Sequence, residues 1–195
     1  MTVRLVSVDA IRVRMSLPED SAIDAVINSA VIGTSIFMAT KLKTCFDQGS
    51  DSDLFLIDAD TVPFKGTYRL LLKNGFIGDS VLESMQRLGD TPVTLPSLRV
   101  NSEKGLITIN EADLVCSVPC YVRVAYTYGF ADLSPIIPDW LSEASLAYSV
   151  QLMSMQQLND VKADTNGVLS VVKAHTNALL DPHYRNDPLA VTPIG

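Results

Sequence analysis

The chain has 195 residues, a length that fits one domain or two small lobes. Its apolar fraction of 47% and charged fraction of 19% argue against a fully disordered, collagen-like or disulfide-stapled chain. The 15 lysines and arginines stand against 22 aspartates and glutamates, and the net charge of −7 argues against a protein that grips nucleic acid through its phosphates.

Cysteine usage and hydropathy indicate a soluble protein of a reducing compartment. Cys45, Cys116 and Cys120 form an odd set, so no complete disulfide framework can be drawn, and their role stays open. Residues 1–15 lack the apolar run of a secretory signal. The most apolar window, residues 26–39, is shorter than the roughly 20 apolar residues of a membrane span, so no membrane partner is expected.

The first predicted elements are a short strand and a long helix. Residues 11–15 alternate between apolar and charged side chains, which favours a strand with one wet face, at a sheet edge. Ser16 and Glu19, with Pro18 between them, form a capping-box pattern that opens a helix. Apolar side chains then recur at steps of three to four residues, which predicts a helix over about 18–46.

The middle of the chain reads as a β-rich insert over about 54–130, because β-branched and aromatic residues come in short runs separated by Gly, Pro and Asn. Residues 79–88 are expected to form a short helix, and 102–105 the turn of a hairpin. Within 122–128, alternate residues are expected to face the core. The predicted strands are 54–57, 68–72, 98–100, 106–109 and 120–128.

A second long helix is predicted over about 138–157, entered through Pro138. The remainder, 158–195, is rich in Asn, Asp, Thr and Pro and is interpreted as an extended tail that orders on a partner. A third helix over 167–180 is the alternative. The predicted fold class is therefore α+β: two long helices packed together, a β-rich insert between them, and an extended C-terminal tail. The main domain is expected to span 1–157.

The search for catalytic residues finds one candidate nucleophile. Gly78 to Leu82 resembles the nucleophile block of GDS-type esterases, in which Ser80 would attack the substrate. The base of that family lies in an Asp-x-x-His pattern, and neither His175 nor His183 has an aspartate at that spacing. An N-cap of the helix predicted from residue 79 is the preferred interpretation of Ser80. We therefore expect that the protein is not an enzyme.

Metal and cofactor sites are not expected either. Cys116 and Cys120 are four residues apart, but no second pair or nearby histidine completes a zinc site, so buried thiols are expected. Glycine-rich phosphate loops are absent. A cluster of aspartates lacks the glycine of a calcium loop and is interpreted as a solvated turn. Its members are Asp51, Asp53, Asp58 and Asp60.

The stretch from Leu98 to Met155 resembles the head-tail connector, or adaptor, proteins of tailed bacteriophages. It contains Leu98-Arg99-Val100-Asn101, then Glu103 to Ile109, then Tyr121 to Phe130 with a Tyr-Thr-x-Gly-aromatic end, and then Ile137-Pro138 opening a helix. Tyr184-Arg185 matches a Tyr-Arg pair that is frequent in the tail of this family.

This resemblance implies a structural ring of twelve copies in the neck of a virion, assembled in the host cytoplasm and seated beneath the portal protein. The ring would pass the genome through its lumen without specific binding, toward a stopper or tail protein. The long helices would pack copy against copy, and the tail would fold against the portal. The residues expected to make that contact are Leu179, Leu180, Pro182, Tyr184, Arg185, Pro188 and Leu189.

Three other functions stay open at this point. A stopper or tail-terminator protein would also form a ring, but with a β-barrel core and little helix. A ligand-binding β-sandwich module is suggested by the tyrosine-rich strand 121–128. The esterase that would use Ser80 is the last alternative.

Overall fold

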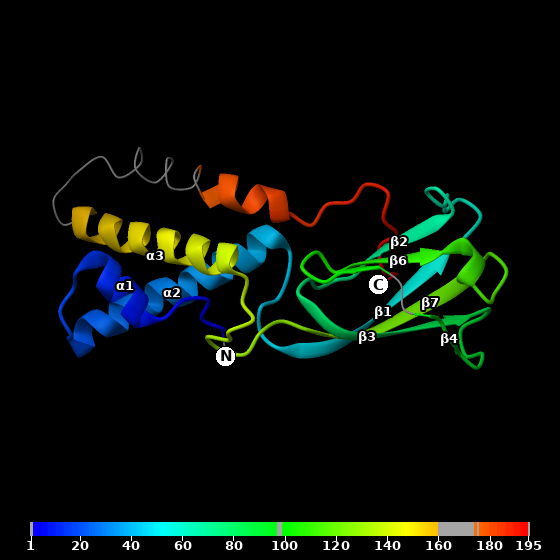
Figure 1. The fold of residues 1–195 in the computed structure, drawn as a ribbon, viewed down its shortest axis with the longest axis horizontal. Coiled ribbons are helices and arrows are strands. Elements are labelled where there is room, and N and C mark those ends of the chain that lie inside the picture. Colours follow the sequence, from blue (N-terminus) through cyan, green and yellow to red (C-terminus); the bar gives the residue numbers. More distant parts are fainter. Residues whose placement is uncertain (1, 97–98, 160–173, 175, 195) are drawn as a thin grey trace. The chain divides into compact units, whose positions relative to one another are not determined.

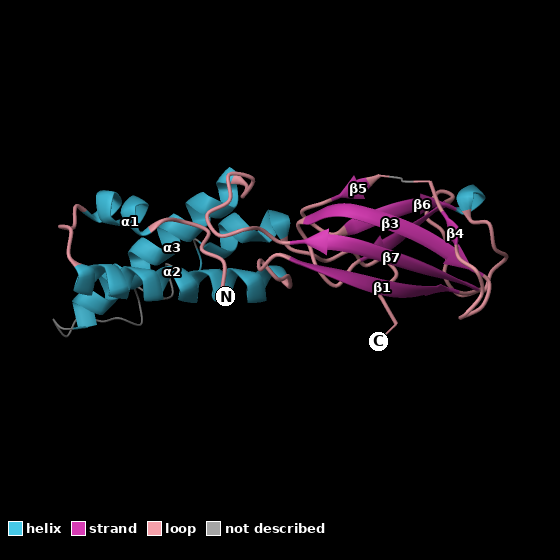
Figure 2. Ribbon diagram, turned by 90° about the horizontal axis from the view of Figure 1, so that it is seen from below, coloured by secondary structure: helices cyan, strands magenta, loops and turns pink. Residues whose placement is uncertain are grey.

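The computed structural model describes residues 2–96, 99–159, 174 and 176–194. The chain divides into two compact units: unit 1 comprises Met1–Leu42 and Phe130–Tyr184, and unit 2 comprises Lys43–Gly129 and Arg185–Gly195. Unit 1 is helical and unit 2 is built mainly of strands (Figures 1 and 2). The predicted α+β class is confirmed, with a β-rich insert between two long helices.

Unit 1 contains α1 (Val8–Met15), α2 (Ser21–Leu42) and α3 (Asp139–Asn159), which pack against one another in all three pairs. Residues 176–180 are also helical. The remainder of the alternative helix over 167–180 lies outside the described residues, apart from position 174. One apolar cluster joins the three helices, with Val6, Ile11, Ile27, Ala30, Val31 and Met153 at its centre.

The strand predicted over 11–15 is wrong, because this segment belongs to α1. The signal that sequence reasoning missed is Ser7, whose hydroxyl accepts a hydrogen bond from the backbone N–H of Ala10 at 3.1 Å and caps the helix. Only Ile11 of the helix is buried, while Val13 is 80% exposed. The alternation of apolar and charged side chains over residues 11–15 therefore does not mark the two faces of a strand.

Replacing Ser7 with alanine is expected to lower the free energy of unfolding by about 1 kcal/mol, because the Ala10 N–H loses its acceptor. Urea unfolding followed by far-ultraviolet circular dichroism measures this change. Val13→Ala is the matched control on the same helix, and no loss of stability is expected from it because the side chain is exposed. An equal loss in both variants would contradict the capping role of Ser7.

The long helix α2 is shorter at both ends than the predicted 18–46. Ser16 does not open it but ends α1 in the left-handed conformation, with φ of 52°. The side chain of Asp20 accepts from the N–H of Ala22 at 2.7 Å and takes the capping role. Lys43, with φ of 50°, ends α2.

The surface of α2 is apolar well beyond the face that packs in unit 1. Ile27 and Met38 are buried, and Phe37 stacks on Tyr148 of α3 with ring centroids 4.6 Å apart. Val26 and Ile36, however, are 46% and 53% exposed. Among the described residues, α2 is the one helix whose length and composition would allow it to cross a membrane. The apolar window of residues 26–39 was too short to indicate this, because α2 extends beyond it at both ends.

Unit 2 contains two antiparallel sheets. One sheet has the strand order β1 (Gly49–Ile57), β7 (Cys120–Tyr128), β3 (Ile77–Met85) and β4 (Val93–Thr94). The other has the order β2 (Thr67–Leu71), β6 (Leu106–Asn110) and β5 (Val100–Asn101). Side chains of both sheets share one core, with Phe55, Leu70, Ile107, Val122 and Val124 among its members, so the unit is a β-sandwich.

Two predictions for the insert are confirmed. The bounds of β7 are the predicted 120–128, and Val122, Val124 and Tyr126 are buried while Arg123 and Ala125 are exposed. The turn at 102–105 joins β5 to β6 as an antiparallel hairpin.

The helix predicted over 79–88 is wrong, because these residues form most of β3. Val81, Leu82 and Met85 also fit a helical spacing, but the segment pairs with β7 along its length, with an irregularity between Ile77 and Ser80. Ser80 therefore lies within a strand, opposite Tyr126, and caps no helix. Cross-strand pairing overrides a local pattern that is compatible with either structure.

The C-terminal segment covers the edges of both sheets at β1 and β2. Val191 pairs in parallel with Leu70 of β2: its N–H donates to Arg69 O at 2.7 Å, and its carbonyl accepts from Leu71 N at 3.0 Å. The N–H of Ile194 donates to Leu54 O of β1 at 2.8 Å. The last residues of the chain thus satisfy backbone groups that an open sheet edge would leave to another protein.

The thiol of Cys120 lies at the start of β7 and is fully buried, as expected, while Cys116 is partly buried. Burial raises the pKa of the Cys120 thiol to about 12, because the thiolate loses its hydration. Since the folded state holds this proton more tightly than the unfolded state, the stabilisation is present below pH 9 and is lost as the pH rises toward 12.

We therefore expect the free energy of unfolding to fall between pH 9 and 12, by up to about 1.4 kcal/mol per pH unit from this thiol. Urea unfolding of the wild-type chain and of Cys120→Val at several pH values measures the slope. The variant is expected to have the shallower slope. Equal slopes would show that Cys120 does not titrate differently in the two states.

Candidate functional site

The side chain of Arg185 makes four hydrogen bonds inside unit 2. It is 5% exposed, and its donors reach four backbone carbonyls. Nε donates to Lys104 O at 2.7 Å, and Nη1 donates to Lys73 O at 2.8 Å and also to Lys43 O. Nη2 donates to Leu72 O. We call Arg185 and these four carbonyls the arginine socket.

Two glycines leave the room that the guanidinium occupies. A Cβ at Gly75 would lie 3.2 Å from Arg185 Cδ, and one at Gly105 would lie 3.2 Å from Arg185 Nη2. Gly105 has φ of +61°, and a Cβ there would also clash with the carbonyl oxygen of Asn74. The socket therefore depends on the absence of side chains at both positions.

A buried carboxylate lies behind the socket. Asp53 of β1 is fully buried, and its Oδ2 accepts from Lys73 N at 2.6 Å and from the Tyr126 hydroxyl at 2.9 Å. Its other oxygen lies 3.6 Å from Lys73 Nζ, an ion pair longer than a hydrogen bond. The peptide groups around Lys73 thus point an N–H at the carboxylate of Asp53 and a carbonyl at the guanidinium of Arg185.

Burial changes the proton affinity of two groups here. It lowers the pKa of the Arg185 guanidinium to about 10, while the nearby Tyr126 and Asp53 oppose the change. It raises the pKa of the Tyr126 phenol, and the hydrogen bond to Asp53 adds to this effect. Near neutral pH the guanidinium therefore stays charged and the phenol stays neutral. The charged guanidinium of Arg185 thus holds the C-terminal segment to the core of unit 2 near neutral pH.

The socket joins the places where the chain enters and leaves unit 2. Lys43 and Arg185 are the first residues of its two segments, and the first segment ends at Gly129. Gly129 donates its N–H to Phe76 O at 3.1 Å, and the hydroxyl of Thr44 accepts from Gly75 N at 2.8 Å. One end of unit 2 is thus tied together by hydrogen bonds at all three crossings.

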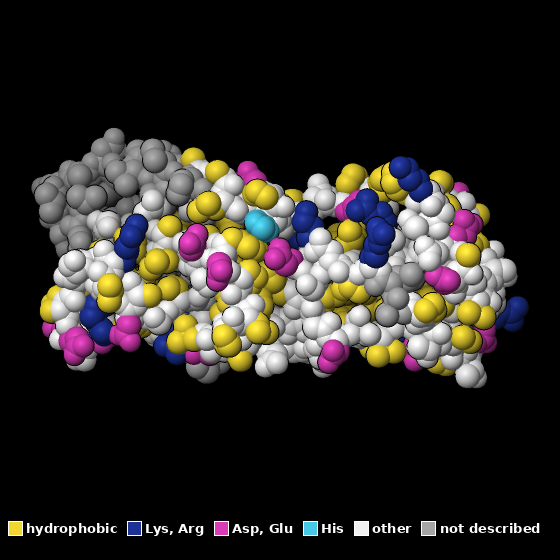
Figure 3. All heavy atoms as spheres, viewed as in Figure 1, with side chains coloured by type: hydrophobic (Ala, Val, Ile, Leu, Met, Phe, Trp, Pro, Cys, Tyr) yellow, Lys and Arg dark blue, Asp and Glu magenta, His cyan; other side chains and the backbone are white. Residues whose placement is uncertain are grey.

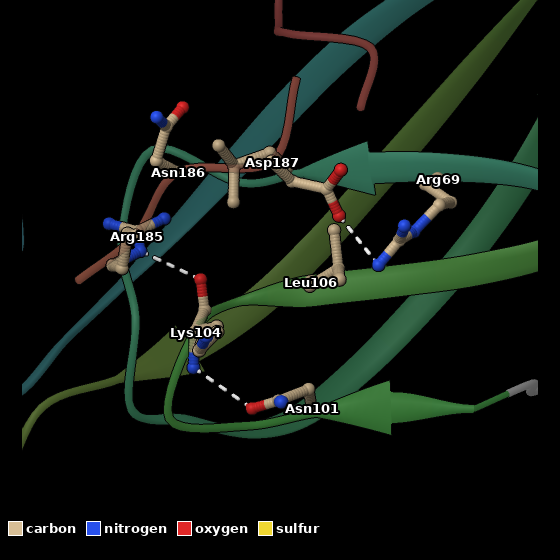
Figure 4. Close-up of a pocket in the computed structure, with 8 residues that line it drawn as sticks. Arg69, Asn101, Lys104, Leu106, Arg185, Asn186 and Asp187 are labelled. Atoms are coloured by element: carbon tan, nitrogen blue, oxygen red, sulfur yellow. Dashed lines mark hydrogen bonds and ion pairs between the residues drawn. The ribbon is translucent and has the colours of Figure 1, made fainter. Parts of the chain in front are cut away.

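A cavity of about 330 Å³ opens beside the socket (Figure 4). Arg69 of β2 and Asp187 form an ion pair across it at 2.6 Å, and Lys104 of the hairpin turn and Asn101 at the end of β5 line it. Dark blue basic side chains gather on the face of unit 2 that Figure 3 shows. This local positive charge contrasts with the net charge of −7 of the whole chain.

The seven residues predicted to contact a partner fall into two groups. Leu180 and Arg185 are buried inside their own units, 3% and 5% exposed. The others are exposed: Leu179, Pro182, Tyr184, Pro188 and Leu189. Next to Pro182 and Tyr184 in the sequence, His183 stacks its ring on that of Trp140 at the start of α3, with ring centroids 3.6 Å apart.

Sequence reasoning missed the buried Asp53 and described it as part of a solvated turn, which is wrong. That description fits Asp58, whose carboxylate accepts from Thr61 N and Oγ1 and from Asp60 N. A signal was available, since Asp53 alternates with Phe55 and Ile57 on the inward face of β1.

The described part of the chain offers no assembled catalytic or metal centre. Ser80 lies in a strand, and no hydrogen bond to a base is found for it among the described residues. His175 lies outside them. Within the same residues, no group of three or more His, Cys, Asp or Glu side chains could hold a metal ion.

Comparison with known proteins gives only distant likenesses. No protein-family model and no curated protein matches the chain. A chain from the neck of an empty gene transfer agent particle, computed with C6 symmetry, is 17% identical with a TM-score of 0.45, over 80% of this chain and 78% of that one. A chain from the virion of a native gene transfer agent particle is 18% identical with a TM-score of 0.45, over 84% of each chain. Likenesses of this size carry no conclusion about fold or function.

Proposed function

We propose that the chain is a structural adaptor subunit of a phage neck. Twelve copies would form a ring beneath the portal at a capsid vertex, continue the DNA channel and connect the capsid to a stopper or tail protein. The chain would act by holding proteins together and not by catalysis. Assembly would take place in the host cytoplasm.

The observation that carries this proposal is the unburied apolar surface of α2. One face of the helix packs on α1 and α3, yet Val26 and Ile36 remain about half exposed. A helix that is apolar on more than one face needs a second partner. In a ring, each copy offers one surface to the neighbour on one side and a different surface to the neighbour on the other side.

The motifs that resemble the adaptor family have structural reasons here. Residues 98–109 form the β5–β6 hairpin in their described part, and 121–130 form β7 and the exit from unit 2. The glycine of the Tyr-Thr-x-Gly-aromatic pattern, Gly129, has φ of +78°, and a Cβ there would clash with Asp47 O. The helix entered through Pro138 is α3.

The helices α1, α2 and α3 of unit 1 favour an adaptor over a stopper or tail-terminator protein, because we expect little helix in the latter two. The net charge of −7 fits a lumen through which DNA passes without being held. For the portal contact we now propose the exposed part of the predicted set, above all Leu179 and Leu189.

The test is to mix the purified chain with its portal and to image the product by electron microscopy. Val26→Asp with Ile36→Asp is expected to abolish rings, since both side chains are exposed in the subunit but would be buried between copies. Val13→Asp, on α1, is the matched control because its side chain is 80% exposed. If the wild type, the double variant and the control form rings equally well, the proposed contact between copies through α2 is refuted.

The portal contact is tested with Leu179→Ser and Leu189→Ser. These changes are preferable to a truncation after Gln157, which would also remove Arg185 and the strand-edge contacts of Val191. Portal binding is expected to fall in both variants while the circular dichroism spectrum stays unchanged. Unaltered portal binding would exclude the tail as the contact.

A further inference from the structure

The topology of unit 2 gathers three loops at one end of the β-sandwich. Ile57, at the end of β1, pairs with Cys120 at the start of β7, and Met85, at the end of β3, pairs with Tyr121. Thr67, at the start of β2, pairs with Asn110 at the end of β6. The loops 58–66, 86–92 and 111–119 therefore lie together, at the end of the strands opposite the arginine socket (Figure 1). We call these three loops the loop end.

Large apolar side chains are exposed on all three of these loops. Val62 is 82% exposed and Phe64 48% in the first loop, and Leu88 is 57% exposed in the second. Val115 is 66% exposed and Val118 40% in the third. Single exposed apolar residues are ordinary on protein surfaces, but five on adjoining loops are typical of a surface that contacts another protein.

Hydrogen bonds join two of the three loops of the loop end. The side-chain amide of Gln86 donates to Ser117 O at 2.9 Å and to Pro119 O at 2.7 Å. Its carbonyl oxygen accepts from Ser117 N at 3.0 Å, so one side chain joins two loops by hydrogen bonds. A recess of about 200 Å³ lies between these loops, with Met85 and Val115 in its lining. Because these hydrogen bonds hold its walls together, the recess can accept an apolar side chain with little loss of entropy.

The loop end carries a net negative charge. Its three loops carry five carboxylates and two cations, Lys65 and Arg87, which gives a net charge of −3. The carboxylates belong to Asp58, Asp60, Asp90, Glu111 and Asp113. Two copies that met through their loop ends would bring these like charges together, which is unfavourable. A different protein whose contact surface combines apolar side chains with a net positive charge would match both features.

We propose that the loop end docks a separate protein whose contact surface combines apolar side chains with a net positive charge. If the adaptor role proposed above holds, this partner is the next neck or tail component. Cyclic symmetry would then point the loop ends of all copies the same way and create one continuous docking surface. The match of charges predicts that docking weakens as salt is added.

The test uses purified tails of the phage that encodes the chain, mixed with the free chain and with capsids that carry it. Val62→Ser/Leu88→Ser/Val115→Ser is expected to reduce tail binding at least tenfold, and Asp60→Lys/Glu111→Lys is expected to reduce it as well. Val81→Ser/Val100→Ser is the matched control, since both side chains are exposed on strands of the same unit. The control is expected to bind tails like the wild type.

The outcomes separate the two proposals. If only the loop variants lose tail binding, the loop end is supported as a docking surface, whether or not the chain binds capsids. Binding of the chain to capsids that carry the portal decides the adaptor role separately. Tail binding that is absent in the wild type, or equal in loop and control variants, overturns the loop end as a docking surface. A change in the mass of the free oligomer caused only by the loop variants would also overturn it, because the occupant would then be a second copy.

Discussion

Replacing Arg185 with alanine is expected to lower the free energy of unfolding by about 3–5 kcal/mol. The change removes a buried charge and leaves the carbonyls of Lys43, Leu72, Lys73 and Lys104 without their donors. It also removes one of the two positive charges near the buried carboxylate of Asp53, the other being the ammonium group of Lys73. Urea unfolding measures the loss, and hydrogen exchange of residues 72–76 is expected to increase by the largest factor.

Two further variants show whether this loss comes from the socket. Arg185→Lys keeps the charge but offers one ammonium group in place of a planar fork, so it is expected to recover only part of the stability. Arg69→Ala breaks the ion pair with Asp187, which is partly exposed, and is expected to change stability by at most about 1 kcal/mol. A loss in Arg185→Ala no larger than that in Arg69→Ala would mean that the carbonyls find other donors.

How far the sequence predicted the fold depends on the length of each pattern and on what else fits it. In β7 the alternation runs over nine residues, and both its bounds and its inward face were predicted correctly. The alternation over residues 11–15 is too short to decide, and the cap at Ser7 made that segment helical. Residues 77–85 fit either a helix or a strand, and pairing with β7, which no local pattern contains, decided for the strand.

The candidate site was predictable only in part, for a physical reason. Every residue has a backbone carbonyl, so no residue type marks the four that hold Arg185. Arg185 itself was singled out through a family resemblance, as a partner contact, but its side chain is buried in its own unit. Asp53 could have been found, because a carboxylate on the inward face of a strand must have buried partners.

Replacing Asp53 with asparagine is expected to lower the free energy of unfolding by about 2–4 kcal/mol, although the two side chains have nearly the same shape. Lys73 N and the Tyr126 hydroxyl both donate to Oδ2 of the carboxylate, and in the variant these two hydrogen bonds lose the strengthening that the negative charge gives them. An amide NH2 group would also replace Oδ1, the oxygen that lies 3.6 Å from the ammonium group of Lys73. The variant also removes a negative charge that stabilises the buried guanidinium of Arg185.

The link between Asp53 and Tyr126 is measured by a double-mutant cycle with Tyr126→Phe. The phenylalanine variant alone is expected to lose about 1–2 kcal/mol, and the double variant less than the sum, with a coupling of about 0.5–3 kcal/mol. Asp51→Asn is the matched control, two residues earlier on the same face of β1 and only partly buried, and a change below about 0.5 kcal/mol is expected. Full additivity of Asp53→Asn and Tyr126→Phe would contradict the link. A loss in Asp51→Asn as large as that in Asp53→Asn would mean that the carboxylates of β1 act through their charge in general, not through the hydrogen bonds behind the socket.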